Sequence, residues 1–338
     1  MAGSNGEVTP PMLEFYEAMA RGGAACIFLG HAFVHPQGRA HSRMTGIHED
    51  SLIPGLRDLG EVIHRHECYV FAQLNHGGSR VQEGYADPMG PSEVPHPLTG
   101  ALARELASSE IREIIESFAR AAARAREAGL DGVLIHGGHG YLISLFTSPL
   151  TNRRLDEWGK GTQGRSRFLE EVYRSIRKAV GPDYPVAVKL GVKDDAEGGL
   201  SVEDGASVAG CLAEAGIDAI EVSGGIPTKE VGADRRDILS REKEAYFLPY
   251  ARAVRARVGQ LPLSLVGGLR SPKLMEEIVT AGWTDFVSLA RPFISEPDLV
   301  SKIRDGRWDP VLCTSCDRCR AGFGRERLRC RRDEEPPT

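Results

Sequence analysis

The sequence predicts an α/β fold of the (β/α)8 barrel type, and three observations lead to this prediction. The chain has 338 residues, a length that fits one barrel of about 250 residues with insertions and a tail. Short apolar runs, typical of buried parallel strands, alternate with amphipathic helical patterns along most of the chain. One of these runs, residues 132–135, is followed at once by polar rings. In an α/β barrel the carboxyl ends of the strands form the catalytic face.

The alternation can be followed in chain order. Strands are predicted at residues 24–29, 68–74, 132–135, 185–190, 219–222, 262–266 and 286–289. Helices are predicted at residues 12–20, 51–66, 108–128, 166–180, 201–215, 242–258 and 271–280. The third helix is typical, because Ser108 can cap its first turn and Gly129 closes it. Residues 30–48, 81–107 and 148–159 are predicted to be loops, and loops this long are usually functional.

Composition narrows the class of protein. The net charge is −5 with 41% hydrophobic and 26% charged residues, and the isoelectric point is about 6.1. Nothing here favours nucleic acid or a membrane surface as a partner. No apolar run approaches the roughly 20 residues of a membrane span, and no secretory signal opens the chain. We expect a cytoplasmic globular protein that could form homo-oligomers.

The polar rings after residue 135 are the candidate catalytic residues. They are His136, His139 and Tyr141, interleaved with glycines that let the backbone turn sharply near a ligand. Two other interpretations are open. Both histidines could be structural residues that bond the backbone. A His-x-x-His pair could also bind a metal, but it needs a third ligand, and no carboxylate lies nearby in sequence.

Residues 136–159, HGGHGYLISLFTSPLTNRRLDEWG, resemble the signature of the Old Yellow Enzyme family of FMN-dependent ene reductases. In that family His-x-x-His/Asn-x-Tyr-Leu precedes an S-P-x-x-N-x-R-x-D-x-[YFW]-G loop. The resemblance extends over almost the whole chain, including residues 34–39 and 73–78. It implies a TIM barrel in which His136 and His139 bind the substrate's carbonyl or nitro oxygen. Tyr141 would then donate a proton, since a phenol is protonated at neutral pH, as a general acid must be.

The resemblance also implies which residues contact the ring of FMN. The Gln73 amide suits the pyrimidine edge, which offers a donor and acceptors. Lys189 would lie beside the N1–C2=O region, where a cation stabilises the charge of the reduced flavin. Gly30, which ends the first predicted strand, is the third expected contact.

The phosphate of FMN is expected at the loops after the last two strands, where barrels of this type often bind phosphate. Backbone N–H groups and one guanidinium would hold it. The expected residues are Gly267, Gly268, Ala290 and Arg291. No Rossmann fingerprint occurs in the chain, so NAD(P)H is expected to use the flavin pocket itself.

The predicted barrel lacks its first strand. In the resembled family a strand of type N-R-I-V-x-x-P-M lies just before the segment that matches residues 1–9. A gap in a barrel leaves two unpaired strand edges. We therefore expect residues 1–308 to be an N-terminally truncated FMN-binding barrel; a barrel of seven strands is the alternative.

Residues 309–338 form a cysteine-rich segment. Cys313, Cys316, Cys319 and Cys330 follow a C-x2-C-x2-C-x10-C spacing, which in a cytoplasmic protein indicates metal ligation rather than disulfides. Relatives similar to 2,4-dienoyl-CoA reductase and trimethylamine dehydrogenase bind a [4Fe–4S] cluster here, with C-x2-C-x3-C-x11-C. This chain is one residue shorter in both later gaps. A [4Fe–4S] cluster, zinc and free thiols are the three interpretations.

Three functional hypotheses follow. The first is an FMN-dependent oxidoreductase that reduces activated C=C bonds of a small unsaturated carbonyl compound, with NAD(P)H as electron donor. The second is an FMN-dependent dehydrogenase that dealkylates amines or ethers. The third is a truncated pseudoenzyme without bound flavin.

Overall fold

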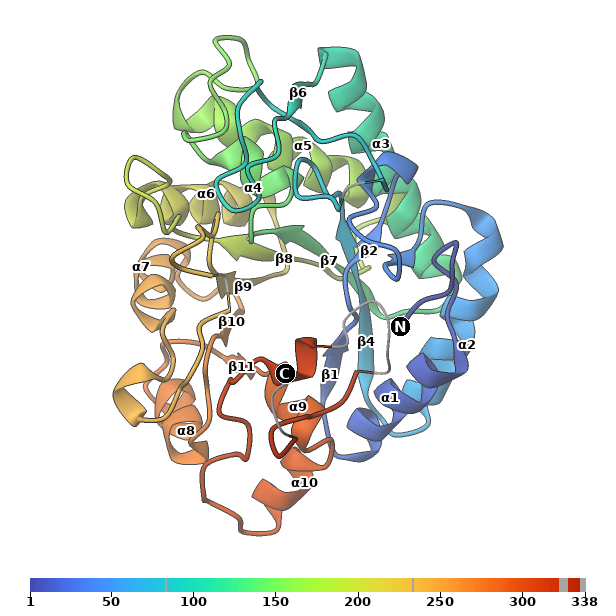
Figure 1. Ribbon diagram of the computed structural model, residues 1–338, viewed down its shortest axis with the longest axis vertical. Helices are drawn as coiled ribbons and strands as arrows, with labels where there is room; N and C mark the ends of the chain where they lie inside the picture. The colour runs from blue at the N-terminus through green and yellow to red at the C-terminus, as the bar shows by residue number, and fades with distance from the viewer. Residues whose placement is uncertain (83, 233, 322–327, 335–338) are drawn as a thin grey trace.

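The computed structural model describes residues 1–82, 84–232, 234–321 and 328–334. Seven strands run parallel around a barrel (Figure 1). They are β1 (Cys26–Phe28), β4 (Tyr69–Asn75), β7 (Gly132–Gly137), β8 (Val186–Gly191), β9 (Ala219–Ser223), β10 (Leu263–Val266) and β11 (Phe286–Ser288). Each pairs in parallel with the next in this order. Within the described residues, no pairing joins β11 to β1.

Four two-residue strands lie outside this ring. β2 (Ala32–Phe33) pairs with β4 and with β3 (Thr45–Gly46). β5 (Met89–Gly90) and β6 (Arg104–Glu105) pair with each other in the long loop after β4. Both pairs follow the carboxyl end of a barrel strand, so they build up the same face of the barrel.

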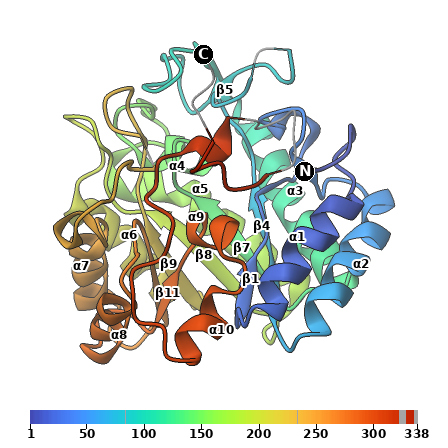
Figure 2. The same cartoon turned by 60° about the horizontal axis from the view of Figure 1, so that its bottom comes forward.

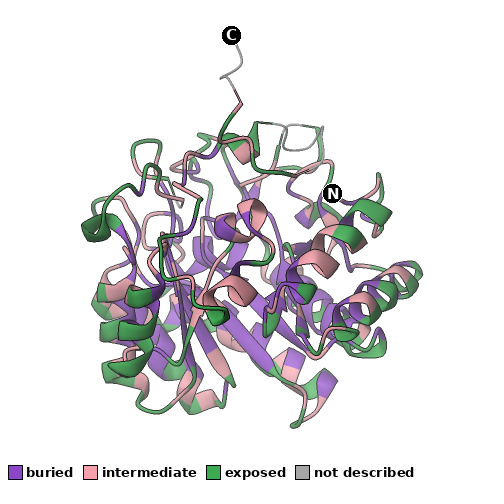
Figure 3. Cartoon of the chain, turned by 90° about the horizontal axis from the view of Figure 1, so that it is seen from below, coloured by how far each residue is buried: buried purple, intermediate pink, exposed green. Residues whose placement is uncertain are grey.

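The helices surround the strands, and buried residues concentrate in the sheet (Figures 1 and 3). They are α1 (Pro10–Arg21), α2 (Ile53–His64), α3 (Ser108–Glu127), α4 (Leu142–Thr147), α5 (Gly161–Val180), α6 (Val202–Ala215), α7 (Leu248–Val258), α8 (Pro272–Thr280), α9 (Arg291–Ser295) and α10 (Leu299–Arg304). None of the described helices is long and apolar enough to cross a bilayer.

Burial on both faces explains why the barrel strands are apolar throughout. Every residue of β7 is buried, since one face meets the barrel interior and the other meets helices. Helix α3 turns its apolar side inward, with Ile111 and Phe118 fully enclosed. This confirms the predicted barrel and its strand order.

Two helices begin five or more residues from the predicted start. Helix α5 starts at Gly161 rather than at residue 166. Gly164 therefore lies inside a helix, where an added Cβ would come within 3.1 Å of the Gly159 carbonyl carbon. Helix α7 starts at Leu248 rather than at residue 242, because Pro249 is accepted only in a first turn. Short helices α4, α9 and α10 were not predicted, since periodicity is weak over five or six residues.

The cysteine-rich segment returns from α10 to the carboxyl end of the barrel (Figure 2). Its backbone bonds two loops there, with Val311 N–H donating to the Arg270 carbonyl and Ile238 N–H donating to the Thr314 carbonyl. The Arg270 guanidinium donates to the carbonyls of Ile238, Val311 and Cys313. Residues 322–327 and 335–338 of this segment lie outside the described part.

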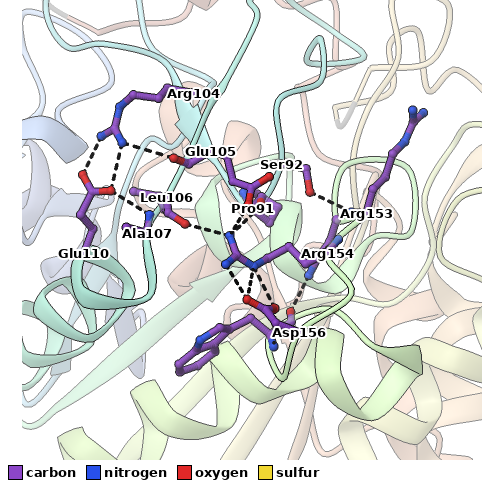
Figure 4. A network of polar contacts seen from close by, with 12 residues as sticks. Pro91, Ser92, Arg104, Glu105, Leu106, Ala107, Glu110, Arg153, Arg154 and Asp156 are labelled. Atoms are coloured by element: carbon purple, nitrogen blue, oxygen red, sulfur yellow. Dashed lines mark hydrogen bonds and ion pairs between the residues drawn. The ribbon is translucent and has the colours of Figure 1, made fainter.

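The loop after α4 is held by one arginine (Figure 4). Arg154 is 7% exposed. Its guanidinium donates to the carbonyls of Pro91 and Leu106 and to the carboxylates of Glu105 and Asp156. Arg154 thereby ties the loop after α4 to the long loop after β4.

Replacing Arg154 with Ala should lower the free energy of unfolding by about 3 kcal/mol, because several acceptors on two loops lose a shared, largely enclosed cation. Urea denaturation followed by circular dichroism measures this change. The neighbouring Arg153 is exposed, so Arg153→Ala is a matched control with little expected effect. Equal stability of the two variants would contradict the role assigned to Arg154.

Candidate functional site

A row of polar side chains crosses three strands at the carboxyl end of the barrel. In the parallel register His136 of β7 lies opposite Lys189 of β8, and Lys189 lies opposite Glu221 of β9. Registered residues of neighbouring strands point to the same face. The Lys189 ammonium accordingly forms an ion pair with the Glu221 carboxylate, and both side chains are nearly enclosed. The sequence indicated His136 and Lys189 but not Glu221.

Four aromatic rings lie close together here, one of them that of His136. The ring centroid of His136 lies 5.2 Å from that of His139 and 5.0 Å from that of Tyr141. The fourth ring is His31, 4.9 Å from Tyr141 and 5.7 Å from His136. The three predicted catalytic residues are therefore together, and His31 joins them although it was not among the candidates. Its position two residues beyond a predicted strand was the available signal.

The turn from β7 to α4 presents these rings. His139 has φ 61°, a left-handed conformation that is uncommon for a residue with a side chain. Gly138 passes so close to the next loop that a Cβ would lie 2.9 Å from the Gly224 carbonyl oxygen. The His139 N–H donates to that same carbonyl, and its Nε2 lies 2.7 Å from the Ser223 hydroxyl. The carboxyl end of β9 thus fixes the orientation of His139.

Burial keeps the histidines of the site neutral. It lowers the pKa of His136 well below its ordinary value, and the charges of His139 and His31 add to this. Burial followed by the charge of Lys189 lowers the pKa of His139. Among the described residues, the buried Nδ1 of His136 has no hydrogen-bond partner. A buried polar atom without a partner is costly, so this nitrogen is suited to a bound ligand.

Arg80 is a second residue that sequence reasoning missed. Its guanidinium lies 4.8 Å from the Tyr141 ring centroid and donates to the His139 carbonyl. A cation over an aromatic face is attracted by the ring. Arg80 therefore links the loop after β4 to the turn that carries Tyr141.

The predicted contacts for the flavin ring lie at the carboxyl ends of β1, β4 and β8. Gln73 of β4 is buried, and its Nε2 donates to the Leu29 carbonyl at 2.9 Å. Gly30 follows β1, and its N–H donates to the Tyr16 hydroxyl at 2.8 Å. The Gly30 N–H, the Gln73 amide nitrogen and the Lys189 ammonium are thus all engaged within the protein.

The predicted phosphate contacts lie after β10 and β11. Gly267 and Gly268 both have positive φ, and an added Cβ at either would meet the Tyr246 ring within 3 Å. Arg291 follows Ala290 at the start of α9. Its guanidinium forms an ion pair with the Asp317 carboxylate at 2.7 Å. Arg291 thus already faces an anion, which the cysteine-rich segment supplies.

All four cysteines of that segment line one small cavity of about 20 Å³ beside Arg291. No three His, Cys, Asp or Glu side chains of the described residues are placed to hold a metal ion. The cavity has room for about one water-sized atom.

The donor set at the barrel face fits FMN by its chemistry. An amide and a cation stand near the ring contacts, and the buried Nδ1 of His136 lacks a partner among the described residues. At the expected phosphate site the Arg291 guanidinium pairs with a carboxylate. A guanidinium binds phosphate through the same charge-assisted hydrogen bonds.

Comparison with known proteins identifies the family. The model of the NADH:flavin oxidoreductase / NADH oxidase family matches residues 2–309. The chain belongs to this family. It is 36% identical to an NADH oxidase of Thermoanaerobacter brockii over 98% of this chain and 51% of that protein. It is 30% identical to a cinnamate reductase of Clostridium sporogenes over 94% of this chain and 50% of that protein.

A solved structure agrees with the fold. The complex of 2-naphthoyl-CoA reductase with 2-naphthoyl-CoA matches with a TM-score of 0.88 at 26% identity, over 97% of this chain and 52% of that one. The chain spans about half the length of both curated relatives, the NADH oxidase and the cinnamate reductase.

The buried histidines predict acid sensitivity. Burial lowers the pKa of His31 and His76 to about 3 and that of His96 to about 4, against about 6.5 in an unfolded chain. The unfolded state therefore binds more protons below about pH 6.5. Stability is complete above that pH and is lost as the pH falls, by up to about 1.4 kcal/mol per pH unit for each histidine.

Urea denaturation at pH 7, 6 and 5 measures this slope. His76→Gln should reduce the pH dependence of the unfolding free energy by the contribution of one histidine, because it removes a group whose pKa burial lowers. His76 accepts a hydrogen bond from the Gly78 N–H in the loop after β4. An unchanged slope in this variant would contradict the neutral state assigned to His76.

Proposed function

We propose that this chain binds FMN at the carboxyl face of its barrel and reduces a C=C bond conjugated to a carbonyl group, with NAD(P)H as electron donor. The observation that carries the proposal is the meeting of His136, His139 and Tyr141 around a buried nitrogen without a partner among the described residues. Bound FMN would supply hydride transfer, which the side chains of this site cannot perform.

Each protein group has a role in this proposal. A neutral imidazole carries one N–H donor, so His136 and His139 can hold the carbonyl oxygen and stabilise the charge that develops on it. Tyr141 donates the proton that completes reduction at the adjacent carbon.

The remaining groups hold the cofactor. Gln73 and Lys189 would hold the pyrimidine end of FMN, with Glu221 fixing the Lys189 ammonium in place. Gly30 would border the ring. Arg291 and the backbone N–H groups of Gly267, Gly268 and Ala290 would hold the phosphate.

The names of two similar proteins support the substrate class. A cinnamate reductase and a 2-naphthoyl-CoA reductase are named for compounds in which an unsaturated carbon system is conjugated to a carboxylate or to a thioester carbonyl. We infer a small α,β-unsaturated carbonyl compound as the substrate of this chain.

We also propose that Cys313, Cys316, Cys319 and Cys330 take up one thiophilic ion, zinc, rather than a [4Fe–4S] cluster. The cavity that they line supports the smaller occupant. Metal and acid-labile sulfide analysis of anaerobically purified protein should give about one zinc and no sulfide per chain. About four irons and four sulfides per chain would show the cluster instead.

The absorption spectrum of the purified protein tests the cofactor. Flavin bands that persist through gel filtration, at about one FMN per chain, are the expected result. Arg291→Ala should weaken FMN binding at least tenfold through loss of a charge-assisted contact, as measured by flavin fluorescence. A colourless protein that takes up no added FMN would contradict the proposal and favour a pseudoenzyme.

Tyr141→Phe tests the chemistry. Stopped-flow measurements separate flavin reduction by NAD(P)H from its reoxidation by cyclohex-2-enone. Reoxidation should slow by about 100-fold or more because the proton donor is lost, while reduction changes little. Equal loss in both half-reactions would show that Tyr141 only shapes the pocket, and turnover of a methylamine but no enone would favour dealkylation.

A further inference from the structure

His31 is half-buried and lies among the proposed catalytic rings, but the proposed mechanism gives it no role. It lies between β1 and β2, immediately before Ala32, and its ring is close to those of Tyr141, His136 and His41. One ring nitrogen, Nδ1, lies 2.9 Å from the Asn75 amide nitrogen. The other, Nε2, lies 3.5 Å from the Tyr141 hydroxyl. His31 therefore bridges the end of β4 to the proposed proton donor.

The contact with Asn75 defines the tautomer of His31. As the structure orients the Asn75 amide, its nitrogen donates to Nδ1, which places the ring proton on Nε2. Burial, aided by the charges of His41 and Arg80, lowers the pKa of His31 to about 3. The imidazole is thus neutral at physiological pH, and its single N–H is directed at the Tyr141 oxygen.

We propose that His31 is a positioning residue for Tyr141: its Nε2–H holds the phenol oxygen and stabilises the negative charge left on that oxygen when the proton leaves. This inference rests on the proposed function. It assigns to the end of β1 a part in the reaction that the three predicted catalytic residues do not provide.

The step can be written with atoms and electrons in balance. The Tyr141 O–H bond breaks, a C–H bond forms at one carbon of the substrate, and the bonding pair of the O–H bond stays on the phenol oxygen. Bound FMN would supply the hydride, with its two electrons, for the other carbon. His31 donates a hydrogen bond throughout and transfers no proton, and solvent later restores the phenol.

Other groups around the phenol are compatible with this role. Arg80 lies over the Tyr141 ring and favours negative charge on it. His136 contacts the ring edge, and an apolar cluster of Phe33, Ala40 and Met44 packs against it. Among the described residues, the polar contact of the Tyr141 hydroxyl oxygen is with His31.

Two substitutions of His31 separate the donor from the ring. His31→Phe keeps a flat ring but removes the N–H, whereas His31→Gln keeps an N–H donor at a similar reach. His76→Gln is the matched control, because it replaces another neutral histidine at the end of β4. Each holoenzyme is reduced with NAD(P)H and reoxidised either by cyclohex-2-enone or by ferricyanide, which takes electrons without a proton.

His31→Phe should slow reoxidation by the enone about tenfold, the worth of a hydrogen bond to a charged group, and leave flavin reduction and reoxidation by ferricyanide unchanged. His31→Gln should recover most of the enone rate, and His76→Gln should match the unaltered protein. Equal slowing with both acceptors, or no slowing in His31→Phe, would overturn the assignment.

A second measurement needs no substrate. Tyrosine ionisation is followed by absorbance at 295 nm, and subtracting the Tyr141→Phe spectrum isolates the signal of Tyr141. This signal should move upward by about one pH unit in His31→Phe and stay in place in His31→Gln. No movement would refute the role of His31. If the unaltered protein ignores enones while the signal still moves, the proposed function fails and the contact between His31 and Tyr141 stands.

Discussion

The parallel register of β7, β8 and β9 is the constraint on which the site depends. It places His136, Lys189 and Glu221 in one row across three strands. Because all barrel strands run the same way, the loops that follow them meet at one face. Residues separated by more than a hundred positions, such as His31 and Tyr141, therefore come within hydrogen-bond distance.

Rigid local structure then sets how the rings point. The backbone of His139 is held in a left-handed conformation and is bonded to the end of β9. Beyond Tyr141, Arg154 fixes the following loop through several acceptors on two segments. The site is thus built from side chains whose backbone has little freedom, as precise binding of a planar cofactor and substrate requires.

Burial provides the chemical state of the site. The histidines are neutral because enclosure penalises their charged form. A neutral imidazole can be assigned one donor and one acceptor, which is why the contact between Asn75 and His31 is informative. Lys189 and Glu221 form an ion pair, which limits the cost of enclosing these two charges.

The sequence by itself determined the barrel, most of its strands and helices, and the residues at the ends of those strands, because burial on both faces demands apolar runs and because His136, His139 and Tyr141 directly follow one. Tertiary structure alone decided the partners. Glu221 looked like a charged residue in a short strand until register set it against Lys189. His31 and Arg80 acquired their places only when loops after β1, β4 and β7 met, and Asp317 met Arg291 only when the cysteine-rich segment returned to the barrel. Such contacts depend on strand order and register, which no local pattern of residues records.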